Sequence, residues 1–245
     1  MTRWLNSPLK RRYSQIWKGS SSKSQQKTHK FIRGRYKFLH QLGQGTSGTV
    51  YLAIDIDTNK QYAIKEINKS WLAKQHLTLK ELPHHTNIIR FIDTFEDPQY
   101  PDALYIVMEV AEKGIVMDVS SYEKCKPYSE SMCKTIFKQL VEAVEHLHKN
   151  NIVHRDIKPQ NLVQTKDNII KLIDFGSAMD VNKCHNYQIG KSPAFMAPEL
   201  LNKEYSSFSS DIWAMGVTLF CLINGHLPFQ QLSLPDLYQD ILIEK

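Results

Sequence analysis

The sequence predicts an α+β protein in which a small β-rich lobe precedes a larger helical lobe. Between residues 36 and 67, short segments of alternating apolar and polar residues are separated by turn residues, a pattern typical of strands. Beyond residue 128, apolar residues recur every three or four positions, a pattern typical of helices. The 42% of apolar residues can furnish a core, and the scattered Gly and Pro exclude a collagen-like architecture.

The N-terminal lobe is predicted to contain an antiparallel sheet. Three consecutive segments form a meander with turn residues between them: 36–41, 49–56 and 61–67. Residues 104–110 are expected to add one more strand, after a loop that contains Pro98 and Pro101.

The C-terminal lobe is predicted to be helical. Ser129 can cap a helix. The apolar residues that recur along this helix are Cys133, Phe137, Leu140, Val144 and Leu147. The nearly apolar run 212–223 is too short to span a bilayer, so no transmembrane segment is expected. One last helix is expected at about 234–243.

The basic charge of the chain is concentrated at its start. The formal charge of +6 and the pI near 9.0 raise the possibility of nucleic-acid binding. However, nine of the 31 basic residues and none of the 25 acidic residues lie in 1–33, which leaves 22 basic against 25 acidic residues in the remainder. Because the body is slightly acidic, we expect no nucleic-acid partner.

Residues 1–35 are predicted to form a flexible basic tail, since their Ser, Gln and Lys content cannot bury enough apolar surface. The aromatic and aliphatic residues that interrupt it are Trp4, Leu5, Tyr13, Ile16 and Trp17. They leave open a short amphipathic segment that contacts anionic surfaces, although a solvated leader is the favoured interpretation. The tail has no apolar core of the kind found in signal peptides.

The cysteines predict reduced thiols. Cys125, Cys133, Cys184 and Cys221 form no CxxC pair and no metal-binding spacing. This usage favours a cytoplasmic location, with a nuclear one as the alternative.

A Gly-rich segment is the first candidate for chemistry. It reads Gly43-Gln44-Gly45-Thr46-Ser47-Gly48, a pattern that arises by chance in roughly one such chain in sixty. A strand follows it rather than a helix, which excludes a Rossmann fingerprint, and the lack of a GK[ST] sequence excludes a Walker A loop. What remains is a hairpin whose backbone can lie close to phosphates, followed by Lys65 on the third strand.

The most specific motif is His154-Arg155-Asp156-Ile157-Lys158-Pro159-Gln160-Asn161, whose chance occurrence is on the order of one in ten thousand. Asp174-Phe175-Gly176 and Ala197-Pro198-Glu199 follow it in order. With these motifs, residues 36 to 245 resemble the eukaryotic protein kinases. Lys158 lies two residues after Asp156, and this spacing resembles the pattern of serine/threonine kinases rather than that of tyrosine kinases.

The resemblance implies a bilobal protein-kinase-like fold, with an N-lobe at 36–110 and an incomplete C-lobe at 111–245. ATP would lie between the lobes. The side chains expected to enclose adenine are Leu42, Val50, Ala63 and Val163. The Glu109 carbonyl and the Ala111 amide would read its edge, with Met108 as gatekeeper. The backbone expected to cover the phosphates belongs to Gly43, Gly45 and Gly48.

The resemblance also implies roles in phosphoryl transfer to a Ser or Thr hydroxyl of a protein substrate. Lys65 would hold the α and β phosphates, and Asn161 and Asp174 would bind Mg²⁺. Asp156 would accept or orient the substrate hydroxyl proton, and Lys158 would neutralise the γ-phosphate. Ser192 is expected to bridge Asp156 and Lys158.

Two stretches, 114–119 and 192–199, resemble the calcium/calmodulin-dependent kinase kinases and their fungal relatives, which suggests an upstream activating kinase in signal transduction. Arg155 suggests regulation by phosphorylation of the loop 177–196. The hydroxyls available there are Ser177, Tyr187 and Ser192.

The sequence departs from the family at two places. The Glu expected on helix C is replaced by Gln75, or by His76 in a slipped alignment. The family's C-lobe continues with more helices and with an Arg that pairs with the Glu matching Glu199. Both are absent here, so we expect apolar surface and the Glu199 carboxylate to be left without partners. Two explanations remain: a truncated or spliced product that has lost these segments, which we favour because the phosphate, metal and base positions are intact, or a pseudokinase scaffold.

Overall fold

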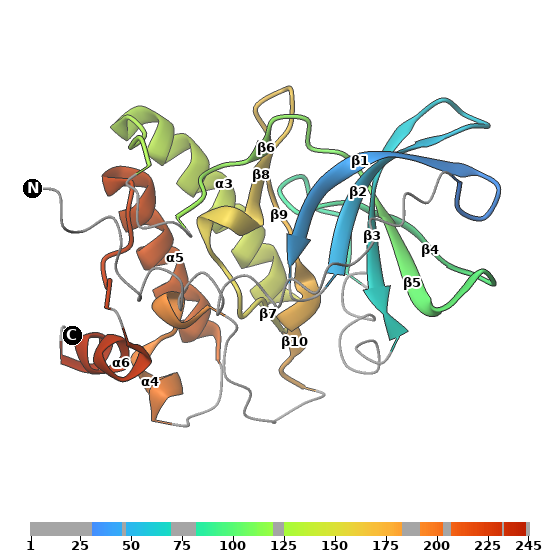
Figure 1. The fold of residues 1–245 in the computed structure, drawn as a ribbon. Coiled ribbons are helices and arrows are strands. Elements are labelled where there is room, and N and C mark those ends of the chain that lie inside the picture. Colours follow the sequence, from blue (N-terminus) through green and yellow to red (C-terminus); the bar gives the residue numbers. More distant parts are fainter. Residues whose placement is uncertain are drawn as a thin grey trace, which may run out of the picture.

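The computed structural model describes residues 31–45, 48–69, 82–119, 125–182, 192–202, 207–231 and 233–243. They form two lobes, a five-stranded sheet and a mostly helical body (Figure 1). The β-rich lobe comes first in the chain, so the predicted α+β bilobal order is confirmed. Gln75 and His76 lie outside the described residues, as do Cys184 and Tyr187.

The sheet of the N-lobe begins with the predicted antiparallel meander. Its strands are β1 (Tyr36–Gly45), β2 (Gly48–Asp55), β3 (Gln61–Asn68), β4 (Phe91–Asp97) and β5 (Tyr100–Met108), in the spatial order β1-β2-β3-β5-β4. Three features differ from the sequence prediction. Strand β1 continues four residues beyond the expected end at 41, and β4 was not predicted. Strand β5 spans 100–108 instead of 104–110, so Pro101 lies in this strand and not in the expected loop. Only two of the seven side chains of β4 are buried, so its sequence lacks a regular apolar alternation.

Aromatic rings fill the N-lobe core. The ring of Phe95 lies between those of Tyr36 and Tyr105, with centroids 5.3 and 5.1 Å apart. Phe38 stacks on Tyr51 at 4.8 Å. These rings come from β1, β2, β4 and β5, so aromatic packing joins strands at opposite edges of the sheet.

Residues just before β1 pack on this aromatic core. Ile32 is fully buried and forms a β-bridge with Tyr36. The backbone amide of Arg33 donates to Asp97 at 2.7 Å. The Arg35 guanidinium donates to the buried Asp55 carboxylate at 2.7 Å and holds the pKa of that carboxyl well below its usual range. Ile32, which the sequence assigned to the tail, therefore belongs to the core of the N-lobe, whereas residues 1–30 of the predicted tail lie outside the described residues.

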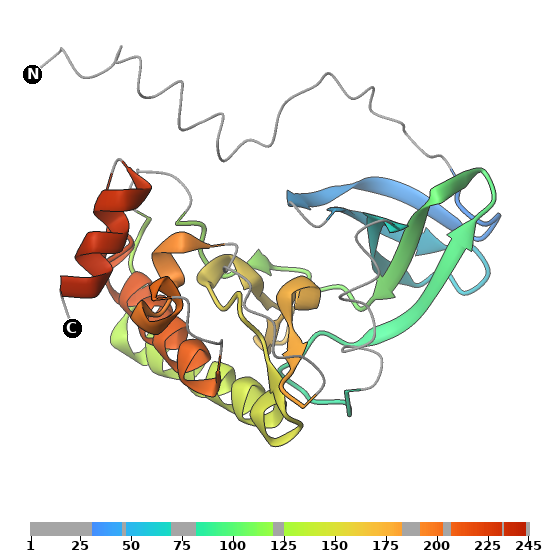
Figure 2. The ribbon, with the colours of Figure 1, turned by 90° about the horizontal axis from the view of Figure 1, so that it is seen from below.

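The C-lobe is built on two long helices that lie side by side, α3 (Glu130–Lys149) and α5 (Phe208–Asn224) (Figure 2). Ser129 caps α3 as predicted, because its hydroxyl accepts from the amide of Met132 at 3.3 Å. Four of the five predicted apolar positions of α3 are buried, and Phe137 packs partly buried against the same core. The last helix, α6 (Leu234–Ile243), has the predicted bounds.

Short elements complete the C-lobe. They are β6 (Gly114–Ile115), β7 (Ile152–Val153), β8 (Leu162–Gln164), β9 (Ile170–Leu172), β10 (Met179–Asp180) and α4 (Pro198–Leu201). Strand β8 pairs with both β6 and β9, and β10 pairs with β7. No helix in the described part of the chain is long and apolar enough to cross a membrane, and the apolar run 212–223 lies within α5.

The outward face of α5 carries exposed apolar side chains. Ile212 and Ile223 are each about half exposed. Together with α3 this face borders a groove of ≈ 460 Å³, whose apolar lining residues are Val141, Val144, Phe208, Ile212 and Met215. The expectation for Glu199 was wrong, since the Ser209 hydroxyl in the first turn of α5 donates to its carboxylate at 3.2 Å.

Replacing Ile32 by Ala should lower the free energy of unfolding by roughly 2–5 kcal/mol, because the change removes a fully buried side chain from the N-lobe core. Urea unfolding of the full chain measures this. Phe31→Ala is the control: its neighbouring side chain is 45% exposed, and the expected loss is below about 1 kcal/mol. Equal effects of the two substitutions would show that Ile32 adds nothing to the stability of the lobe.

Candidate functional site

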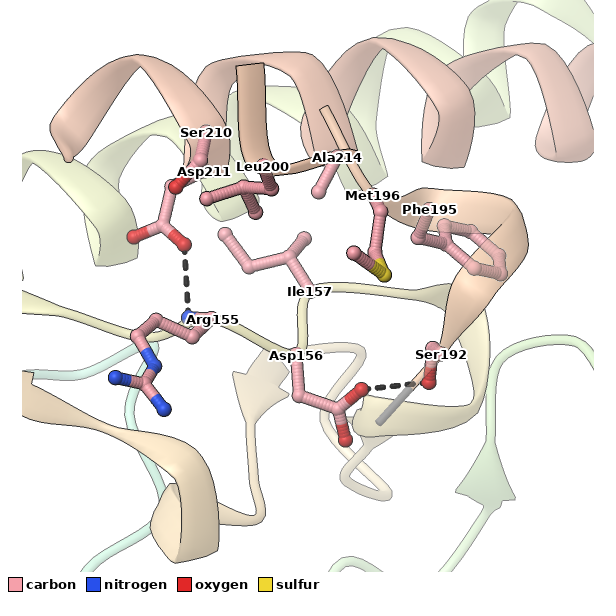
Figure 3. Close-up of a pocket in the computed structure, with 10 residues that line it drawn as sticks. All are labelled: Arg155, Asp156, Ile157, Ser192, Phe195, Met196, Leu200, Ser210, Asp211 and Ala214. Carbon is pink, nitrogen blue, oxygen red and sulfur yellow. Dashed lines mark hydrogen bonds between the residues drawn. The ribbon is translucent and has the colours of Figure 1, made fainter. Parts of the chain in front are cut away.

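The loop 154–161 between β7 and β8 is anchored to α5 by a buried carboxylate. Asp211, in the first turn of α5, is 1% exposed. It accepts hydrogen bonds from the backbone amides of His154 at 2.8 Å and Arg155 at 2.9 Å (Figure 3), and a His148 ring nitrogen lies at 3.0 Å. The loop thus takes its shape from a residue more than fifty positions downstream. Sequence reasoning missed this role, because Asp211 is distant from the motif that it supports.

Hydrophobic packing holds the same loop against the C-lobe helices. Ile157 is fully buried and points from the loop toward Leu200 of α4 and Ala214 of α5 (Figure 3). A cavity of only ≈ 20 Å³ remains between these groups. Because Ile157 is closely packed, the backbone beside it has little freedom to shift, and this restricts Asp156, the preceding residue.

Asp156 is 5% exposed and is surrounded by hydrogen-bond donors. The Lys158 ammonium lies 3.1 and 3.0 Å from its two carboxylate oxygens, and the Ser192 hydroxyl donates to Oδ1 at 2.7 Å. Lys158 also donates to the Ser192 oxygen at 2.8 Å. The predicted base, the predicted phosphate lysine and the bridging serine therefore form one cluster, with Ser192 in the bridging position.

Asn161 joins the same cluster and links it to the second motif. Its amide nitrogen donates to the Asp156 carboxylate at 3.0 Å and to the Asp156 carbonyl at 2.6 Å. Its backbone carbonyl accepts from the amide of Ile173 at 2.9 Å. The loop 154–161 is therefore fastened directly beside Asp174.

An ion pair crosses between the lobes. The Lys65 ammonium on β3 lies 2.7 Å from Oδ1 of Asp174, although the two residues are 109 positions apart. Asp174 has a left-handed backbone, with φ 60°, and its carboxylate also accepts from the amide of Gly176 at 3.3 Å. The structure thus brings Lys65, predicted to hold the α and β phosphates, into contact with Asp174, a predicted metal ligand.

Asn161 and Asp174 offer two oxygen ligands, a number that suits Mg²⁺ better than a metal ion whose ligands are all protein side chains. Within the described ranges, no group of three or more His, Cys, Asp or Glu side chains could hold a metal ion. Mg²⁺ commonly takes one or two protein oxygens and completes its shell with water and substrate phosphates. The Asn161 amide nitrogen faces Asp156, so its side-chain oxygen would be the ligand atom of the predicted metal site.

The residues predicted to enclose adenine come from both lobes. Leu42, Val50 and Ala63 lie on the adjacent strands β1, β2 and β3, whereas Val163 lies on β8. Ala63 pairs with Met108 at the end of β5, next to the linker that carries Glu109 and Ala111. The register therefore places the predicted gatekeeper beside the predicted adenine-reading backbone.

The three glycines of the Gly-rich hairpin have different structural requirements. Gly48 has φ +140°, and a Cβ added there would overlap the Glu66 carbonyl oxygen. Gly43 and Gly45 have nothing within 4 Å of an added Cβ. Gly48 is therefore needed by the sheet itself, while the open space beside the other two is available to a ligand.

Two of the predicted phosphorylation candidates can be located. Ser177 is buried at the end of the Asp174-Phe175-Gly176 turn, and Ser192 belongs to the Asp156 cluster. Arg155 extends toward β10, where its guanidinium lies 3.3 Å from the Met179 sulfur. Regulation through the loop 177–196 stays a prediction.

The fold and this arrangement of motifs define a protein kinase domain. The family model of the protein kinase domain matches residues 36–244, and the chain therefore belongs to the protein kinase family. This match confirms the resemblance to the eukaryotic kinases and the bilobal fold that it implied.

Curated relatives are serine/threonine kinases. A probable serine/threonine-protein kinase of Dictyostelium discoideum is 36% identical over 239 residues, which cover 87% of this chain and 33% of the relative. A calcium/calmodulin-dependent protein kinase kinase of Emericella nidulans is 32% identical over 84% of this chain and 49% of its own length. The serine/threonine-protein kinase PKH2 of Saccharomyces cerevisiae is 34% identical over 86% of this chain and 21% of its own length. The chain thus spans about half or less of the length of these relatives.

Gly48→Ala should lower the free energy of unfolding by roughly 1–3 kcal/mol, since alanine is strained at this φ and its methyl group would displace a strand carbonyl. Gly43→Ala, which meets open space, is the matched control and should change stability by less than about 1 kcal/mol. Urea unfolding without nucleotide separates the two. A Gly48→Ala protein as stable as the control would contradict the conformation described for this residue.

Proposed function

We propose that the chain is an ATP- and Mg²⁺-dependent protein kinase that transfers the γ-phosphate of ATP to Ser or Thr hydroxyls of proteins. The observation that carries this proposal is the cluster of Asp156, Lys158, Asn161 and Ser192 beside the ion pair of Lys65 and Asp174. Kinase chemistry needs a carboxylate at the attacking hydroxyl and cations at the phosphates. Here Asp156 would supply the carboxylate, and Lys158 and Lys65 would supply the cations.

The first step is nucleotide binding. Lys65, which pairs with Asp174 in this structure, would turn its ammonium toward the α and β phosphates. Asn161 and Asp174 would hold Mg²⁺, which when bound supplies positive charge to the β and γ phosphates. The open backbone at Gly43 and Gly45 would allow the phosphates to approach β1 closely.

The second step is the transfer itself. The substrate oxygen forms a bond to the γ-phosphorus while the bond from that phosphorus to the β-phosphate oxygen breaks, and ADP leaves. Asp156 would orient the hydroxyl and accept its proton. Lys158, which already lies against Asp156, would neutralise charge on the transferred group.

An upstream position in a signalling cascade is the finer form of this proposal. It is supported by the stretches 114–119 and 192–199 and by the similarity to the kinase kinase of Emericella nidulans. The partner is then a protein with an accessible Ser or Thr. A solvated leader stays the favoured interpretation of the basic tail, with contact to anionic surfaces as the alternative, and we expect no nucleic-acid partner.

A pseudokinase scaffold, which binds nucleotide and partners with little turnover, is the second candidate. It is favoured by Gln75 at the position where the family has Glu, and by the pairing of Lys65 with Asp174, a residue that the metal also needs. Nucleotide binding without phosphoryl transfer would distinguish this function from the kinase.

Asp156→Asn should lower phosphoryl transfer to a protein hydroxyl by roughly two to four decades, because it removes the proton acceptor while keeping the side-chain shape. Transfer of labelled γ-phosphate by the full chain measures the rate, and nucleotide affinity is measured in parallel. Asp102→Asn, an exposed change on β5, is the matched control and should transfer at the unaltered rate. An unchanged rate in Asp156→Asn would refute the assignment, and binding without turnover in the unmodified chain would favour the scaffold.

A further inference from the structure

Lys171 is a buried cation at the junction of the two lobes, and the phosphoryl-transfer chemistry above does not use it. It lies in the middle of β9, and its side chain is only 7% exposed. Its ammonium pairs with the Glu109 carboxylate at 2.7 Å and donates to the Thr86 carbonyl at 2.9 Å. Burying an ammonium is costly, so these partners must compensate for the water that it loses.

The carboxylate that Lys171 contacts belongs to the linker between the lobes. Glu109 directly follows β5, and its backbone carbonyl is the group predicted to read adenine. The Glu109 carboxylate also accepts from the amide of Arg90 at 2.6 Å, while the Glu109 amide donates to the Arg90 carbonyl at 3.1 Å. The backbone of Glu109 is thus bonded to Arg90, and its carboxylate is bonded to both Arg90 and Lys171.

The platform beneath Lys171 is fixed independently of its charge. Segment 86–90 runs along β9, where the amide of Leu172 donates to Asn87 at 2.8 Å and the amide of Ile89 donates to Leu172 at 3.0 Å. The Asn87 side chain also donates to the Ile170 carbonyl at 2.9 Å. Loss of the Lys171 ammonium would therefore leave this junction joined and would remove the charged partner of Glu109.

We propose that Lys171 is a positioning residue that fixes the linker backbone of Glu109 and Ala111 through the Glu109 carboxylate, and thereby sets the affinity for the adenine group. This inference rests on the proposed function. Lys65 acts at the phosphates, so the two lysines govern opposite ends of the same nucleotide. Substitution of Lys171 should therefore lower the affinity for every ligand that carries adenine, whereas substitution of Lys65 should lower the affinity only for ligands that carry phosphates.

The test compares adenosine and ADP as ligands of the full chain by calorimetry. Lys171→Met should weaken both about 5- to 20-fold, because both carry adenine, and should raise KM for ATP by a similar factor with kcat changed less than about threefold. Lys65→Met should weaken ADP but not adenosine. Lys166→Met, an exposed change on the same β8–β9 hairpin, is the matched control and should bind both ligands normally.

Glu109→Gln keeps the shape of the side chain and removes its charge, so it decides the matter if Lys171→Met does not fold. It should weaken adenosine and ADP by about threefold, and the double variant with Lys171→Met should bind no worse than Lys171→Met alone. Unchanged adenosine affinity in both single variants would overturn the inference while the proposed function stands. An unmodified chain that binds neither ligand would overturn both.

Discussion

The buried carboxylate of Asp211 is the interaction on which the candidate site depends. It holds two consecutive backbone amides, those of His154 and Arg155, and Arg155 has φ 66°, a conformation that a side-chain-bearing residue seldom adopts without compensation. The next residue in the chain is Asp156. Removing the carboxylate would release the strained turn and leave buried amides without acceptors, so the direction of the Asp156 side chain is a property of α5 as much as of its own loop.

A second constraint is the junction between the lobes, where ion pairs bring together elements from distant parts of the chain. Lys65 pairs with Asp174, and Lys171 pairs with Glu109. The partners of each pair come from different lobes or from the linker between them. Partial burial strengthens such pairs because water screens them less, so the relative position of the lobes depends on a few charged contacts as well as on apolar packing.

The fold could be predicted where local periodicity reflects burial, and not where tertiary contacts override it. The meander β1–β3, the capped helix α3 and the last helix α6 follow from apolar spacing. Strand β4 was missed because its apolar and polar residues do not follow its burial: Ile92 is exposed and Asp97 is buried. Ile32 was assigned to the tail because basic residues surround it. The motifs predicted candidate site residues, and the structure brings four of them together: Asp156, Lys158, Asn161 and Ser192. Asp211 and Lys171 make long-range contacts that no local pattern contains.

Helix α5 has two faces with unequal surroundings. One carries Asp211 into the core against the loop 154–161, and the other presents Ile212 and Ile223 to solvent. Any molecule that bound the outer face of the folded chain, and not the unfolded chain, would stabilise the helix by mass action, by an amount that grows with the logarithm of its concentration once this exceeds the Kd. Because the same helix holds His154 and Arg155, occupancy of this apolar surface and the order of the loop 154–161 are thermodynamically linked.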